Sequence, residues 1–127
     1  PLFDQEDETI NHVLLTCVVA RSVWAVVCEA LGKVEWSPMA HDSLALWLRD
    51  KQGMDNNNRK DLHTIFLFVL WVLWKHRNAI VLDGASPSIM GLIGRIRSEG
   101  RLWSLAGKFK GNVDPFFLRL EWWASNE

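Results

Sequence analysis

The chain has 127 residues, with 14 Lys and Arg against 15 Asp and Glu and a formal net charge of −1. This length and composition are those of one globular domain, so a two-domain protein is excluded. A charge so near zero gives no overall attraction to nucleic acid or to an anionic membrane, and any such binding needs a local patch. Eight Trp and no Tyr predict a core rich in indole rings, each of which needs a partner for its single N–H.

The expected compartment is intracellular, nuclear or cytoplasmic. Cys17 and Cys28 are too few for a disulfide framework, which favours a reducing environment. The N-terminal segment lacks the basic start and apolar stretch of a signal peptide, and a first residue other than Met suggests a fragment. The longest apolar run, Ile65 to Trp74, has ten residues. This is about half of the ~20 needed to cross a bilayer, so no membrane contact is expected and a buried core helix is favoured.

The first half of the chain predicts two helices and a short amphipathic segment. Apolar residues at helical spacing indicate a short helix from Thr9 to Leu15 and a second helix, of about four turns, from Val18 to Leu31. Gly32 is expected to end the second helix. An amphipathic segment carrying Leu44, Trp47 and Leu48 follows, with a cap at Asp42 or Ser43, and a polar loop runs from Gln52 to Asn58.

The longest element is expected from Arg59 to Leu82. Its middle, Ile65 to Trp74, is apolar on every side, which indicates a helix buried on several faces. A β-strand is the competing interpretation because Val, Ile, Phe and Trp favour strands. The length of the run and the cations that follow it, Lys75-His76-Arg77, favour a helix.

Two further helices are predicted after this one. Asp83-Gly84 is expected to end the long helix, and Ser86-Pro87-Ser88 to cap the next, with Pro at the first helical position and an apolar face from Ile89 to Trp103. Asp114-Pro115 starts a last short helix.

The predicted fold class is therefore all-α, with four to five helices packed around a long apolar central helix. Gly91 and Gly94 each cost the helix that contains them ~1 kcal/mol relative to Ala. We expect them to offset this cost by allowing that helix to pack closely against the central helix. Four indoles fall on predicted buried faces: Trp24, Trp71, Trp74 and Trp103.

The most informative spacing is His12-x4-Cys17, the second half of a zinc knuckle, in which an imidazole and a thiolate occupy two corners of a tetrahedron. The surrounding runs are Pro1-Leu2-Phe3, Glu8 to Cys17, and Ala20-Arg21-Ser22-Val23-Trp24. Together they resemble the zinc-binding domain at the C-terminal end of plant non-LTR (LINE-type) retroelement reverse transcriptases. The pattern of that family is Cys-Pro-x-Cys, an acidic spacer ending in Glu-Thr, His-x4-Cys, then Ala-Arg-x-x-Trp.

The resemblance extends over nearly the whole chain. Trp71 to Asn78 is similar to the family's Trp-x-x-Trp-Lys-x-Arg-Asn run, and Arg101 to Gly107 contains its Leu-Trp-x-x-Ala-Gly segment. It implies a non-catalytic region outside the polymerase and endonuclease domains of an RNA-directed DNA polymerase. The sequence agrees, because it contains no Gly-rich phosphate loop, nucleophile elbow or His-Glu-x-x-His motif, and no catalytic residue is expected.

The metal site that the resemblance implies is predicted to be degenerate. The first knuckle cysteine would precede Pro1 and the second falls on Phe3, so only His12 and Cys17 remain of four ligands. The other potential ligands lie at no ligand spacing from this pair: Cys28, His41, His63 and His76. No cofactor is therefore expected, and zinc only if the missing ligands come from outside the chain. Otherwise His12 is a partly exposed helix residue, and Cys17 and Cys28 are small buried hydrophobes.

Charge is unevenly distributed along the chain. Residues 1–74 carry a net −4, whereas residues 75–127 carry eight basic and five acidic residues, a net +3. The candidate phosphate-binding cations all lie in the second part: Lys75, His76, Arg77, Arg95, Arg97, Arg101, Lys108 and Lys110. Trp71 and Trp74 beside the first three could stack on bases. The favoured alternative is that these cations complement the helix dipole while both indoles pack inward.

Two functions are carried forward. In the first, residues 1–31 are a partial zinc-knuckle-like segment with its helix, and residues 32–127 are the helical remainder of the same single domain. The resemblance then implies weak, salt-sensitive binding of RNA or DNA by a non-catalytic reverse transcriptase region. In the second, the chain is a domesticated or decayed helical module, without metal or nucleic acid, that binds a protein partner through exposed Trp residues.

Overall fold

The computed structural model describes residues 10–53, 59–84, 88–109 and 113–125. A π-helical turn, η2 (His12–Thr16), and a 3-10 turn, η3 (Val34–Trp36), flank the first of five α-helices. The α-helices are α2 (Val18–Ala30), α3 (Leu44–Gly53), α4 (Arg59–Asp83), α5 (Ile89–Leu105) and α6 (Asp114–Ser125). The described ranges contain no strand, so the all-α prediction and its long central helix are confirmed.

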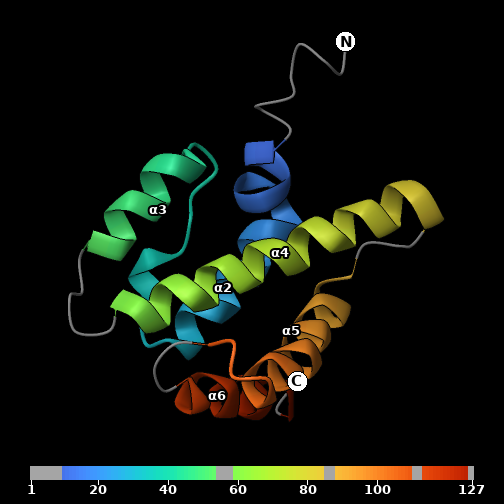
Figure 1. Ribbon diagram of the computed structural model, residues 1–127. Helices are drawn as coiled ribbons and strands as arrows, with labels where there is room; N and C mark the ends of the chain where they lie inside the picture. Colours follow the sequence, from blue (N-terminus) through green and yellow to red (C-terminus); the bar gives the residue numbers. More distant parts are fainter. Residues whose placement is uncertain (1–9, 54–58, 85–87, 110–112, 126–127) are drawn as a thin grey trace.

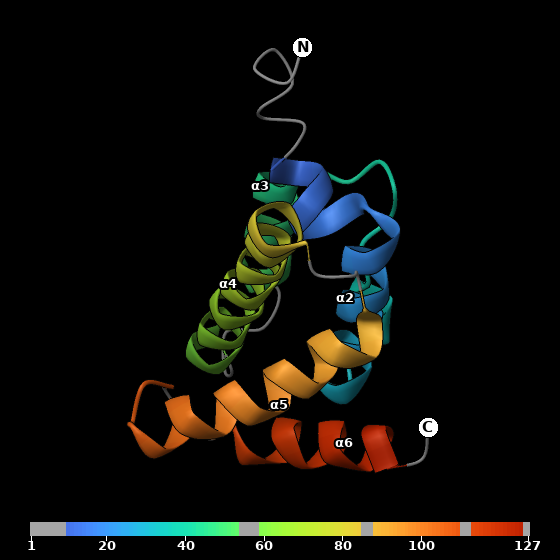
Figure 2. The ribbon, with the colours of Figure 1, turned by 90° about the vertical axis from the view of Figure 1, so that its right-hand side faces the viewer.

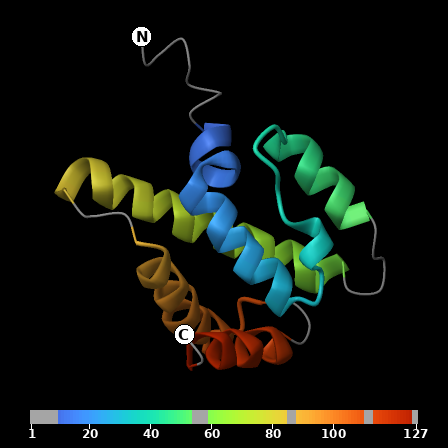
Figure 3. The same cartoon turned by 180° about the vertical axis from the view of Figure 1, so that it is seen from behind.

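The long helix α4 runs across the molecule and the other helices lie on either side of it (Figure 1). It contacts η2, α3 and α5, while α2 contacts η3, α5 and α6. Figure 3 shows α2 crossing α4, with α3 over the first half of α4. Figure 2 shows α5 and α6 side by side at the opposite edge, so the chain forms one body around α4.

A cluster of buried indoles fills one side of the core. The ring centroid of Phe66 on α4 lies 5.4 Å from that of Trp24, 5.2 Å from that of Trp47 and 6.4 Å from that of Trp36. The indole N–H of Trp24 donates to the backbone oxygen of Leu14 (2.8 Å), and that of Trp47 donates to the backbone oxygen of Trp36 (2.9 Å). Both donors are thus satisfied at burial. The predicted Trp-rich core is confirmed for Trp24, Trp36 and Trp47, whereas Trp103, also predicted on a buried face, is half-buried.

A second aromatic cluster surrounds Phe68 and joins α4 to the C-terminal helices. Its ring centroid lies 4.9 Å from that of Trp103 on α5, 5.4 Å from that of Phe109, and 6.5 Å from those of Phe117 on α6 and Trp71 on α4. Edge-on and tilted rings at these distances attract beyond the area that they bury. Two residues of one helix therefore organise the two halves of the core.

Most predicted helix ends agree with the structure. Gly32 and Gly84 follow α2 and α4 with positive φ angles of 75° and 70°, the left-handed conformation that glycine adopts without a Cβ penalty. Ser88 caps α5, its hydroxyl oxygen accepting a backbone N–H three residues later (2.9 Å), and Ile89 is the first helical residue, so the prediction of Pro at that position was wrong. Ser86 and Pro87 themselves lie outside the described residues. The helix α3 continues through Gln52, so the polar loop begins later than predicted.

The cap of α3 comes from a distant part of the chain. The backbone N–H of Leu44 donates to Oδ1 of Asn11 (2.6 Å), and the Asn11 amide donates to the backbone oxygen of Asp42 (3.1 Å). The Asp42 carboxylate instead accepts the N–H of Met39 (2.7 Å), which closes the preceding turn. The prediction of a local cap at Asp42 or Ser43 was therefore wrong, because a tertiary hydrogen bond replaced it.

The helix α4 is buried along one arc rather than on several faces. Phe66 and Phe68 lie about 160° apart around the helix and bound this arc. On the opposite side five apolar residues are exposed, and we call them the open face of α4: Leu67 (48% exposed), Trp71 (39%), Trp74 (44%), Val81 (59%) and Leu82 (79%). The prediction that Trp71 and Trp74 pack inward was wrong. The neighbouring helices cover only the arc of α4 that runs from Phe66 to Phe68, and both indoles lie outside this arc.

By length and composition alone, Leu62–Asp83 could cross a bilayer, and 33% of that window is buried in the structure. The core helix of a soluble protein passes the same test. The side chains of the buried arc belong to the hydrophobic core, so α4 is a core helix as predicted, although it is buried along one arc and not on the several faces predicted for its apolar run.

Close helix packing occurs at Gly100 rather than at the two glycines predicted for it. A Cβ on Gly100, which is buried in α5, would overlap the ring of Phe117 on α6. A Cβ on Gly94 would meet nothing within 4 Å, and one on Gly91 would meet only the capping Ser88. The glycine that matters therefore supports the α5–α6 contact and not a contact with the central helix.

Gly100→Ala should lower the free energy of unfolding by about 1–3 kcal/mol, because the Phe117 ring is itself packed against other rings and has little room to move. Gly94→Ala, the matched control in the same helix, should raise it by up to ~1 kcal/mol. Urea unfolding followed by circular dichroism measures both. Equal effects of the two substitutions would contradict the close approach at Gly100.

Candidate nucleic-acid interface

The structure divides the predicted cations between two surfaces. Four lie where α4 crosses α5: Lys75, His76, Arg95 and Lys108. Two others, Arg97 and Arg101, lie between α5 and α6. Arg77 follows Trp74 on α4, and Lys110 lies outside the described residues. The eight predicted cations therefore do not form one continuous basic patch.

Lys75 contacts both an aromatic ring and a carboxylate. Its Nζ lies 4.1 Å from the ring centroid of Trp71 and donates to Oε1 of Glu99 at 3.1 Å. Nη2 of Arg95 lies 3.7 Å from the same Glu99 oxygen. One carboxylate thus faces two cations, and this part of the surface keeps an excess of positive charge.

Two indoles and two lysines are joined by successive contacts at the surface, and we call them the aromatic–lysine surface: Trp71, Lys75, Trp103 and Lys108. The ring centroids of Trp71 and Trp103 are 5.4 Å apart, and Nζ of Lys108 lies 5.7 Å from the ring centroid of Trp103. Trp71 and Lys108 are exposed and the other two residues are half-buried. Cations beside aromatic faces are the chemistry that proteins use to contact phosphates and bases together.

His76 lies at the edge of this surface but has a different character. Its Nε2 is buried and has no hydrogen-bond partner among the described residues. Burial, and secondarily the positive charge of Arg95, lower the pKa of His76 below its ordinary value of 6.5. The ring is therefore mainly neutral at pH 7, which leaves phosphate contacts to the lysines and arginines.

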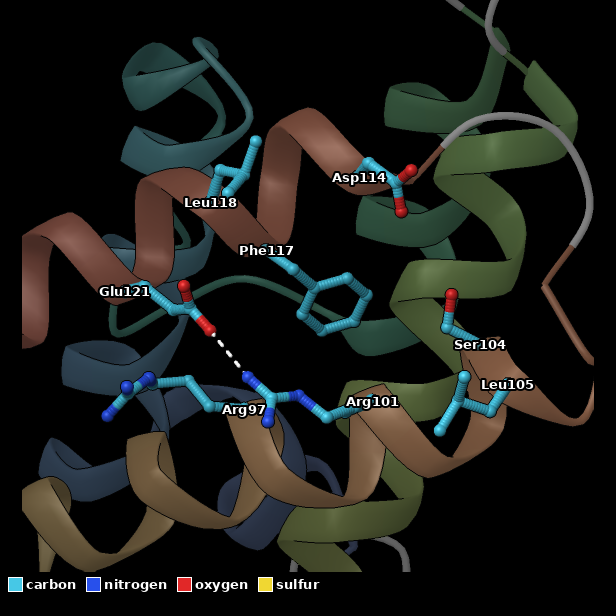
Figure 4. A pocket seen from close by; sticks show the side chains of 8 residues that line it. All are labelled: Arg97, Arg101, Ser104, Leu105, Asp114, Phe117, Leu118 and Glu121. Atoms are coloured by element: carbon cyan, nitrogen blue, oxygen red, sulfur yellow. Dashed lines mark hydrogen bonds and ion pairs between the residues drawn. The ribbon is translucent and has the colours of Figure 1, made fainter.

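The other two arginines line a groove of about 360 Å³ between α5 and α6 (Figure 4). Nη2 of Arg101 forms an ion pair with Oε1 of Glu121 at 3.0 Å, and Asp114 also lines the groove. The Nε of Arg97 is buried without a partner among the described residues. Two arginines and two carboxylates line this α5–α6 groove, so it has no excess charge and is a poor site for a phosphate backbone.

The two residues of the partial zinc knuckle have separate local roles. His12 is exposed on η2, whereas Cys17 caps α2, its Sγ accepting the backbone N–H of Ala20 at 3.3 Å. Cys17 is therefore a half-buried cap rather than the buried hydrophobe predicted, and Cys28 is buried in the core as expected. Within the described ranges no three His, Cys, Asp or Glu side chains gather as a metal site would require.

Sequence reasoning did not identify the contacts that build the aromatic–lysine surface. Lys75 and Glu99 are 24 residues apart, and Trp71 and Trp103 are separated still further. No helical spacing relates residues so distant, and only the crossing of α4 and α5 brings them together. The available signal was chemical: Lys75 and Lys108 each lie within five residues of a tryptophan in the sequence.

Comparison of the chain with protein-family models, curated proteins and solved structures gives no match. The structure defines the class of protein: an all-α fold whose described residues present an aromatic–lysine surface and, beside it, the open apolar face of the central helix.

The lowered pKa of His76 makes stability depend on pH. The unfolded chain binds the proton more readily than the folded one, so the free energy of unfolding should fall as the pH drops below 6.5 towards the folded-state pKa. Denaturant unfolding at a series of pH values should show a smaller slope in this window for His76→Gln. An unchanged slope in His76→Gln would rule out this role.

Proposed function

We propose that the chain is a non-catalytic C-terminal region of a retroelement reverse transcriptase-like protein, and that it binds RNA or DNA weakly through the aromatic–lysine surface. The origin rests on the resemblance of the sequence. Two of the resembling runs, Trp71 to Asn78 and Arg101 to Gly107, lie on α4 and at the end of α5. The observation that carries the binding proposal is that Lys75 and Lys108 each lie over an indole of these runs.

The charge of this region supports contact with phosphates despite the near-neutral chain. Residues 75–110 include seven basic and two acidic residues, a net +5. Glu99 forms ion pairs with Lys75 and Arg95 and so neutralises part of their positive charge, and Glu121 pairs with Arg101. Only a few cations therefore remain for phosphates, fewer than the roughly six to ten contacts of a strong binder, so the binding is weak and sensitive to salt.

The proposal includes no metal or other cofactor. Zinc would require ligands from outside this chain, because only His12 and Cys17 of the four knuckle ligands are present in it. No catalytic role is proposed for any residue, and the surface acts by binding alone.

Titration with a fluorescently labelled oligonucleotide tests the binding. Affinity should fall steeply between about 50 and about 200 mM salt, because each phosphate contact releases counterions. The double variant Lys75→Gln/Lys108→Gln should bind several-fold more weakly at low salt, because it removes both cations that lie over the indoles. It should also reduce the slope of log affinity against log salt by about 1 for each cation removed.

Arg49→Gln is the matched control, since it removes one positive charge from an exposed position on α3, away from the aromatic–lysine surface. It should leave both the affinity and the salt slope close to wild type. Absence of binding at low salt, or an affinity that does not change with salt, would contradict the proposed function.

A second candidate function is favoured by the open face of α4. Five exposed apolar residues on one helix face form a patch of the kind that marks a protein–protein contact. Under this proposal the chain is a helical interaction module, and its partner covers the face now exposed to solvent.

Leu82→Lys separates the two candidates, because Leu82 is 79% exposed on the open face and contributes little to the core. Nucleic-acid binding should be unchanged or strengthened by the added cation, whereas association through the apolar face should be weakened. Sedimentation velocity at several concentrations, with and without an oligonucleotide, measures self-association and nucleic-acid binding together. Self-association of the wild type that Leu82→Lys abolishes, without oligonucleotide binding in either protein, would favour the second candidate over the first.

A further inference from the structure

We infer that the open face of α4, together with the cations beside it, selects single-stranded over duplex nucleic acid, and that the exposed ring of Trp74 stacks on an unpaired base. This inference rests on the proposed function and names its substrate class. It follows from where this ring lies, from the cations beside it and from the apolar surface around it.

Trp74 presents the more open of the two indole rings on this face. Its side chain is 44% exposed, and it makes no ring or cation contact within the described part of the chain. Trp71 precedes it by three residues and is 39% exposed. Side chains three apart on a helix are neighbours on one face, with Cβ atoms about 5–6 Å apart. The Trp71 ring already contacts Lys75 Nζ and the Trp103 ring, so Trp74 is the ring available to accept a base of a single strand, with Trp71 beside it.

Cations lie on both sides of Trp74. Lys75 follows it and places Nζ 4.1 Å from the Trp71 ring centroid, with Glu99 accepting one of its three donors. Arg77 lies on the other flank of Trp74 around the helix, and no ion pair to Arg77 occurs among the described residues. A strand whose bases cover the indoles would therefore bring its phosphates to positive charge on either side.

A duplex does not fit the same surface. Its base faces are stacked inside the helix, so it presents phosphates where the open face presents Leu67, Trp71 and Trp74. Phosphates against these apolar groups would lose water without gaining hydrogen bonds, which is unfavourable. A single strand instead turns apolar base faces towards the rings and leaves its phosphates at the cationic edges. Charge complementarity at those edges favours a nucleic acid over a neutral apolar partner.

The test compares a labelled single strand of about 12 nucleotides with a hairpin duplex of the same composition, at about 50 mM salt. Fluorescence anisotropy of the full chain should give an affinity for the single strand at least about tenfold higher. Trp74→Leu keeps apolar bulk but removes the aromatic face, and should weaken single-strand binding by about tenfold, whereas Trp74→Phe should weaken it far less. Circular dichroism checks that each variant folds, which is expected because Trp74 lies outside the core.

Leu67→Ala is the matched control on the same helix face, 48% exposed and without a ring to stack. It should change single-strand affinity by less than about twofold. Equal binding of single strand and duplex, or wild-type affinity in Trp74→Leu, overturns the inference and leaves the proposed function in place. A loss in Leu67→Ala as large as in Trp74→Leu also overturns it, since the face would then act by general apolar contact. Binding of neither ligand overturns the proposed function and the inference together.

Discussion

The position of two phenylalanines on the central helix organises the whole domain. Phe66 and Phe68 are two residues apart, which places them about 160° apart around α4 and directs them into different aromatic clusters. The first cluster unites α2, η3 and α3, and the second unites α5 and α6. Truncating a buried Phe to Ala costs about 3–5 kcal/mol. This is a large share of the ~5–15 kcal/mol that stabilises a domain, so loss of either ring should destabilise the domain strongly.

The same constraint explains why α4 leaves apolar residues in solvent. The neighbouring helices cover the arc of α4 between Phe66 and Phe68. No helix among the described residues covers the open face on the opposite side. The exposed residues there are as apolar as those buried. Exposed apolar residues gathered on one helix face lower solubility and commonly mark a binding site, which is why we consider the open face functional.

The proposed binding of nucleic acid depends on the cations that lie beside the open face of α4. The crossing of α4 and α5 brings Lys75 and Lys108 to the indoles of Trp71 and Trp103, whereas the α5–α6 groove balances its arginines with carboxylates. A nearly neutral chain can therefore present one locally cationic strip. The proposed nucleic-acid contact and the single-strand preference both derive from this local arrangement and not from net charge.

The sequence predicted the elements well because their signals are local. The 3.6-residue period of α2 and the glycines that end α2 and α4 operate within a few residues. The burial of α4 was mispredicted because Ile65 to Trp74 is apolar on every side, so the sequence pattern does not indicate which face of the helix is buried. The Asn11 cap of α3 and the contact of Gly100 with Phe117 join residues far apart in sequence, and no local pattern specifies them. The surface cations were found by residue type, but their division between two surfaces depends on tertiary packing.

The indole N–H signals in a nuclear magnetic resonance spectrum test the central claim most directly, namely that the open side of α4 and its junction with α5 form the recognition surface. On addition of a single-stranded oligonucleotide, the signals of Trp71, Trp74 and Trp103 should shift. Those of Trp24 and Trp47 should stay in place, since both are buried and donate to backbone oxygens. An oligonucleotide that shifts none of the signals, or that shifts the buried ones as much as the exposed ones, would contradict the account.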